Sequence, residues 1–324
     1  MPNPHGPSVL TSARAAWARQ DFAPLRAALS RAWEVAPVAA RRAPEGALQD
    51  GLRRIEGPVA ANPMSGALFL RGRRLAPPPP EAGGEPRPTD WIVQSFPSRL
   101  RYPALAPLWY GQTADLAAIL VEALPRAIAL ERAPEAAGAV ALVSLRLGRL
   151  DRMQEMLNAG VFAPRAVKVH AWDKLISAPL AWRLETPPAP EDLRTGAARL
   201  RAAFGGEAVG GAPLVLLKGG EAAAAAGLAE AARRAGAAIL DPDATPLARL
   251  VRAIAAAPRL LVGGRGELAA ALLAGAGCAV GELAAPARAP RGALAAAAME
   301  KPPEILAGEA ADIWLRAGSG TASL

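Results

Sequence analysis

A chain of 324 residues, of which 52% are hydrophobic, can bury a large core, so length and composition exclude an intrinsically disordered protein and favour two domains over one. Its 37 lysines and arginines outnumber 29 acidic residues and give a formal net charge of +8, but the arginines are interleaved with acids, which argues against a nucleic-acid-binding surface. A single cysteine, Cys278, excludes an intrachain disulfide, and two distant histidines, His5 and His170, predict neither a histidine metal site nor a histidine-centred triad.

The sequence also predicts where the protein resides. The N-terminus lacks the basic segment and apolar run of a signal peptide. Charged residues such as Glu122, Arg126 and Glu282 interrupt each apolar stretch before it reaches the ~18 residues that a membrane helix requires. We therefore expect a cytoplasmic protein without an integral membrane segment, whose arginines are compatible with peripheral membrane contact.

The first 90 residues predict a helical and irregular region. Residues 11–34 have a helical pattern, and the signal from 36 to 57 is weak. Residues 67–73 predict a β-hairpin. The proline-rich run 76–88 predicts a linker or exposed loop, either a plain spacer or a proline-motif ligand.

Residues 91–185 alternate strands and helices and predict a first Rossmann-like domain. The aromatic residues between 91 and 110 suit either a buried core or stacking on a sugar ring. A helix is expected from 115 to 130, interrupted at Pro125. The further expected elements are strands at 139–143, 166–169 and 173–177 and a helix at 150–159 that ends at Gly160.

Residues 186–290 predict a second Rossmann-like domain with about four strands. It follows a proline-rich break and is followed by a tail, 291–324, with a short returning helix at 304–316. The expected elements in order are a helix to Phe204, a strand at 214–217, a helix at 221–235, a strand at 238–240, a helix, a strand at 260–262, a glycine loop, a helix and a strand ending at Leu283.

The glycine loop is the first candidate site. Gly263, Gly264 and Gly266 stand where a strand gives way to a helix, and backbone N–H groups and the helix dipole can receive an anion there. A tight turn between a strand and a helix requires glycine with or without a ligand, so both interpretations remain open.

Three blocks of the sequence resemble glycosyltransferase family 61. Residues 115–126, DLAAILVEALPR, are similar to the family's N-Y-x-H-W-L-L-[DE]-x-L-P-R segment, and 152–179 resemble its next block. Residues 238–283 are similar to its last block, V-x-P-E … V-G-P-H-G-A-G-L-A-N-L-L-F … V-V-E-L. The resemblance implies a GT-B architecture of two Rossmann-like domains facing across a cleft, with residues 91–185 on the acceptor side and residues 186–290 on the nucleotide-sugar side.

The chain departs from the family's polar signature at several positions. In the first block, Ala118 occupies the histidine position and Asp115 the asparagine position. In the last block, Arg265 replaces the histidine, Glu267 and Leu268 replace Ala-Gly, and Ala271 replaces the asparagine. Lys218 stands for an arginine that often ends the first strand of the C-terminal domain.

The resemblance implies an inverting hexosyl- or pentosyltransferase that moves a sugar from a nucleotide-sugar donor to a glycan or other hydroxyl acceptor in bacterial surface polysaccharide synthesis, without metal or cofactor. Such a transfer needs a base for the acceptor hydroxyl and cations or helix N-termini for the departing diphosphate. The residues implied are Glu122 as base or orienting group, Arg126 as its support, and Lys218, Gly263, Gly264, Arg265, Gly266 and Glu282 for the donor.

Other interpretations of the same residues remain open. Glu122 and Arg126 have the i, i+4 spacing of a surface ion pair worth ~0.3–0.5 kcal/mol. Lys218 also suits a solvated turn, and Glu221 and Glu267 at helix starts would repel a phosphate. The alternatives are therefore a diverged transferase, a catalytically inactive relative that acts as a binding or assembly module, and an unrelated two-domain α/β protein.

Overall fold

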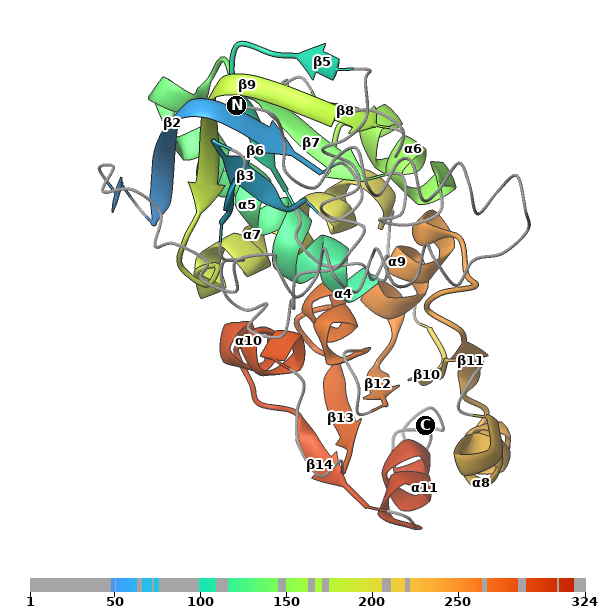
Figure 1. The fold of residues 1–324 in the computed structure, drawn as a ribbon. Helices are drawn as coiled ribbons and strands as arrows, with labels where there is room; N and C mark the ends of the chain where they lie inside the picture. The colour runs from blue at the N-terminus through green and yellow to red at the C-terminus, as the bar shows by residue number, and fades with distance from the viewer. Residues whose placement is uncertain are drawn as a thin grey trace, which may run out of the picture. The chain divides into compact units, whose positions relative to one another are not determined.

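The computed structural model shows an α/β protein, as predicted, with two units that each contain a β-sheet (Figure 1). The first unit takes its described residues from Met1–Gln112, Ala133–Leu145 and Ala166–Thr186. The second takes them from Thr113–Arg132, Arg146–Arg165 and Pro187–Leu324. The structure describes residues 48–49, 51–62, 66–71, 73–75, 99–108, 116–144, 150–162, 167–170, 175–205, 211–218, 222–263, 267–284, 290–307 and 309–317.

The first sheet combines parallel and antiparallel strands. Its described strands are β1 (Leu48–Gln49), β2 (Leu52–Ala61), β3 (Leu68–Leu70), β4 (Arg73–Arg74), β5 (Arg99–Arg101), β6 (Leu105–Pro107), β7 (Val140–Ser144), β8 (Val167–His170) and β9 (Leu175–Leu184). Their order is β4-β3-β2-β9-β6-β7-β8, with β1 beside β2 and β5 beside β9. Strands β2, β3 and β4 form an antiparallel edge, whereas β6, β7 and β8 run parallel to β9.

Strand β2 pairs with β9 along most of its length, although the local sequence signal before Gly57 is weak. A register shift between Glu56 and Val59 coincides with Gly57, whose φ of 121° favours glycine. The predicted hairpin at 67–73 is confirmed by the pairing of β3 with β4. The prediction of a helical or irregular region is therefore wrong for Leu52–Ala61, which forms a strand because β9 supplies its hydrogen-bond partners.

The second sheet is parallel throughout its described strands. These are β10 (Leu214–Leu216), β11 (Ala238–Leu240), β12 (Arg259–Val262), β13 (Ala279–Leu283) and β14 (Glu304–Leu306), in the order β11-β10-β12-β13-β14. Numbered along the chain, this is the doubly wound order 2-1-3-4-5. The predicted strands at 214–217, 238–240 and 260–262 and the one ending at Leu283 are confirmed, and β14 raises the expected four to five.

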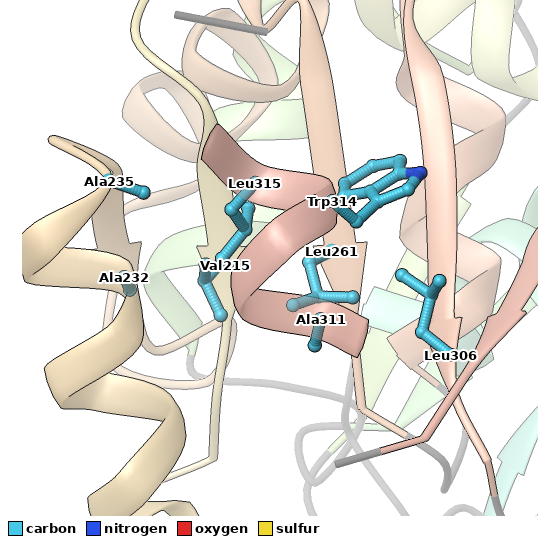
Figure 2. Close-up of a cluster of buried hydrophobic side chains, with 8 residues drawn as sticks. All are labelled: Val215, Ala232, Ala235, Leu261, Leu306, Ala311, Trp314 and Leu315. Atoms are coloured by element: carbon cyan, nitrogen blue, oxygen red, sulfur yellow. The ribbon is translucent and has the colours of Figure 1, made fainter. Parts of the chain in front are cut away.

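Helices cover both faces of this sheet. They are α8 (Ala222–Arg234), α9 (Leu247–Ala256), the 3₁₀ helix η5 (Glu267–Leu273), α10 (Pro290–Ala298) and α11 (Glu309–Arg316). Helix α11 packs with α8, and Figure 2 shows its side chains Ala311, Trp314 and Leu315 beside Val215, Leu261 and Leu306 of the sheet. On the other face, η5 contacts both α9 and α10.

Further helices pack outside α9, η5 and α10. They are α4 (Leu116–Ala118), the π-helical turn η2 (Ile119–Ala123), α5 (Leu124–Arg132), α6 (Leu150–Asn158) and α7 (Pro190–Phe204). The predicted interruption at Pro125 is wrong, because the chain continues as a helix from 116 to 132. Proline lacks an N–H and its ring clashes with the carbonyl four residues earlier, and the widened π turn just before Pro125 accommodates both.

Two predicted helix ends are confirmed, and one predicted helix is corrected. Gly160 and Gly236 follow α6 and α8 with φ of 66° and 65°, the left-handed conformation of a terminating glycine. The returning helix expected at 304–316 is shorter, because Glu304–Leu306 joins the sheet as β14 and only Glu309–Arg316 is helical.

Several predictions fall outside the described residues. These include the helical pattern at 11–34, the proline-rich run at 76–88, Glu221, and every aromatic residue between 91 and 110 except Tyr102. Within the part of the chain that the structure describes, no helix has both the length and the apolar surface to cross a membrane.

Candidate functional site

The order of the second sheet fixes where a ligand would bind. Between β10 and β12 the chain connections diverge in opposite directions, which makes this the topological switch point. Ligands of open α/β sheets bind outside the carboxyl ends of the strands at that point. Lys218 lies two residues beyond β10 and Gly263 directly follows β12, and Leu216 and Val262 at the ends of these strands are register partners.

Lys218 has two carboxylates close to its ammonium group. Its Nζ lies 3.6 Å from Oε1 of Glu267 at the start of η5 and 3.8 Å from Oδ2 of Asp243 in the loop between β11 and α9. The lysine side chain is 27% exposed and that of Asp243 46%, whereas Glu267 is buried. We call these three residues the Lys218 group.

The loop that carries Asp243 is held by hydrogen bonds within itself. Asp241 follows β11, and its Oδ1 accepts hydrogen bonds from the backbone N–H of Asp243 at 2.7 Å and of Ala244 at 3.2 Å. The backbone N–H of Thr245 donates to the carbonyl of Asp241 at 2.9 Å. This Asx turn places Asp243 beside Lys218 at the carboxyl edge of the sheet.

Glu282 lies on a neighbouring strand of the same sheet. It is buried in β13 and is the register partner of Val262 on one side and Ile305 on the other. Its alternation with Gly281 places its side chain on the sheet face opposite to the cluster around Trp314. Glu282 and the Lys218 group therefore lie in the carboxyl half of the same sheet. This is where residues on separate strands could contribute to one donor site.

Glu122 occupies a different environment, the π turn η2. Arg126 donates to its Oε2 through Nη1 at 3.4 Å, and Arg291 of α10 contacts its Oε1 through both Nε and Nη2. Glu122 and Arg126 are 0% and 2% exposed, so the interpretation as a surface ion pair is wrong although the pair exists. We call Glu122, Arg126 and Arg291 the Glu122 cluster.

This arrangement does not suit general-base catalysis. A base must lie within hydrogen-bond reach of the proton that it removes. Both carboxylate oxygens of Glu122 instead contact arginines of the same unit. The two arginines neutralise the buried charge of Glu122.

The remaining predicted positions offer less information. Gly264, Arg265 and Gly266 lie outside the described residues, so their predicted roles remain predictions. Cys278 is half-buried, and burial raises the pKa of its thiol to about 11, which keeps it protonated and a poor nucleophile at neutral pH. Among the described residues, no three His, Cys, Asp or Glu side chains gather as metal ligands would.

No protein-family model matches the chain, and a search of curated proteins finds no relative. The resemblance to glycosyltransferase family 61 therefore rests on the three sequence blocks.

Two residues of these groups escape sequence reasoning. Arg291 lies 169 positions from Glu122, and only the packing of α10 against η2 brings the two together. Asp243 carries a local signal, because the Asp-Pro-Asp sequence after a strand is typical of a turn at the ligand edge of a sheet.

Proposed function

We propose that the second unit binds a nucleotide-sugar donor at its switch point and that the chain is a diverged GT-B-type glycosyltransferase. The single observation that carries the proposal is the place of Lys218, a partly exposed cation at the carboxyl edge of β10 where the strand order reverses. The resemblance blocks supply the ligand class, with a diphosphate near Lys218 and Arg265, and a glycan or other hydroxyl acceptor.

The diphosphate and the ribose of the donor each have a partner in this proposal. The diphosphate approaches Lys218, since a cation forms charge-assisted hydrogen bonds with phosphate oxygens. The ribose hydroxyls donate hydrogen bonds to a carboxylate, for which Glu282 is the candidate. Glu122 shapes η2 and α10 through Arg126 and Arg291 and takes no proton from the acceptor.

A titration tests the donor site directly. We expect isothermal calorimetry with UDP and UDP-sugars to detect binding by the full chain, and Lys218→Ala to weaken it about tenfold, as the loss of a charge-assisted contact implies. Glu230→Gln on α8, a half-exposed ion-paired carboxylate, is the control and should leave the affinity unchanged. Absence of heat at millimolar nucleotide sugar would refute the proposal.

A second candidate function is a catalytically inactive relative that binds without transferring. It is favoured by the Glu122 cluster, because the glutamate that the family resemblance marks as base is engaged by two arginines. Incubation with nucleotide sugars and detection of released nucleotide separates the two: turnover by the wild-type chain that Lys218→Ala lowers would reject the inactive relative.

A further inference from the structure

The Lys218 group carries more negative than positive charge. Two carboxylates, Asp243 and Glu267, lie within 4 Å of one ammonium group, so the three side chains sum to a charge of −1. A phosphate that approaches Lys218 meets the field of both carboxylates. The lysine is thus already occupied by protein charges before a ligand arrives.

The two carboxylates differ in how easily they can move away from Lys218. Glu267 is buried at the start of η5, where its negative charge also stabilises the helix end. The side chain of Asp243 is nearly half exposed and can turn toward solvent when an anion displaces it. Of the two, Asp243 is therefore the carboxylate that competes reversibly with a ligand.

Helix α6 fixes the loop from which Asp243 competes. The buried guanidinium of Arg152 donates through Nη2 to the carbonyl oxygens of Pro242 and, at 2.7 Å, of Thr245, which flank Asp243. One turn further along α6, Oε2 of Glu155 accepts a hydrogen bond from the backbone N–H of Ala248 at 3.3 Å, in the first turn of α9. Together with the Asx turn, these bonds hold the backbone of Asp243 from both sides.

We propose that Asp243 is an internal competitor for the ligand's phosphate, held against Lys218 by the clamp of Arg152 and Glu155, and that it sets the charge selectivity of the switch-point site. This inference rests on the proposed function. The penalty imposed by Asp243 grows with ligand charge, so nucleoside diphosphates lose most affinity, monophosphates less and uncharged nucleosides none. Asp243 acts through Lys218 and is a specificity residue with no role in a chemical step.

Calorimetry on the full chain with uridine, UMP and UDP tests this gradient. Replacing Asp243 by Asn removes one charge and keeps the size of the side chain. We expect Asp243→Asn to bind UDP about three- to fivefold more tightly, UMP about twofold more tightly, and uridine with unchanged affinity, since an ion pair at a partly exposed site is weak. Adding Lys218→Ala to Asp243→Asn should abolish the gain.

Glu230→Gln provides the matched control. Glu230 is ion-paired to Arg233 and 49% exposed, close to the 46% of Asp243, and its neutralisation changes the net charge equally. It should leave all three affinities unchanged. An equal gain with Glu230→Gln would assign the effect to net charge, and an equal gain for uridine would assign it to loop loosening; either result overturns the inference.

Failure of the inference and of the proposed function give different results. If wild type and Asp243→Asn bind UDP equally well, the competitor is overturned and the donor site stands. If neither protein binds UDP although both are folded and share one unfolding temperature, the donor site itself is refuted, and so is the competing role of Asp243.

Discussion

The Glu122 cluster and the Lys218 group are built from the same kinds of side chain, yet they differ in solvent exposure and in charge balance. In the Glu122 cluster one buried carboxylate meets two arginines, and the residual charge is positive. In the Lys218 group one partly exposed cation meets two carboxylates, and the residual charge is negative. Each group contains residues that the family resemblance marks as functional.

The difference suits the Glu122 cluster to a structural role and the Lys218 group to the proposed ligand binding. Removing one partner of a buried ion pair leaves an uncompensated charge, so such a pair is hard to break and poorly suited to exchange partners. The partly exposed pair of Lys218 and Asp243, at 3.8 Å, is weak enough for a ligand to replace one partner. The sites of stability and of binding in this unit are therefore expected to be distinct.

The largest effect is expected from Glu122→Ala. It leaves Arg126 and Arg291 without their shared carboxylate, and it should lower the free energy of unfolding by ~3–5 kcal/mol. Urea unfolding followed by circular dichroism measures this loss.

Glu191→Ala is the control for Glu122→Ala. Glu191 pairs with Arg194 at i, i+3 spacing on α7, but both side chains are exposed. Its loss should cost no more than ~0.5 kcal/mol. If the two variants lose the same free energy of unfolding, burial does not make the Glu122 cluster more important for stability than an exposed ion pair.

An intermediate effect is expected from Glu267→Gln. The amide keeps the shape of the buried side chain but removes the charge that faces Lys218 and stabilises the start of η5. We expect a loss of about 1–2 kcal/mol in the free energy of unfolding. A higher free energy of unfolding for Glu267→Gln would contradict this expectation and show that the buried charge of Glu267 destabilises the fold.

The local elements of the second unit could be predicted because their signals are local. Apolar runs of three to five residues and the terminating glycines at 160 and 236 each act within a few positions. Strand β14 escaped prediction because Glu304–Leu306 becomes a strand only through pairing with β13.

The candidate site was predictable only in part, for the same reason. Lys218, Gly263 and Glu282 follow or end strands, and the carboxyl edge of a parallel sheet brings such residues together. The burial of Glu122 depends on the helices α7, η5 and α10 packed around η2, and no pattern around position 122 encodes them or the pairing with Arg291. Spacing of i, i+4 predicts a pair but not whether other helices cover it.

The smallest effect on stability is expected from Lys218→Met. Met keeps the apolar stem and removes a charge whose attraction to Asp243 and Glu267 is partly screened, and the loss should remain below ~1 kcal/mol. The same substitution removes the cation on which the donor site depends, so nucleotide affinity should fall while the unfolding midpoint changes little. Paired urea and calorimetric titrations of one preparation measure both quantities. A loss of stability as large as that of Glu122→Ala would make Lys218 structural, and the switch-point site would then have to bind its anion through backbone N–H groups alone.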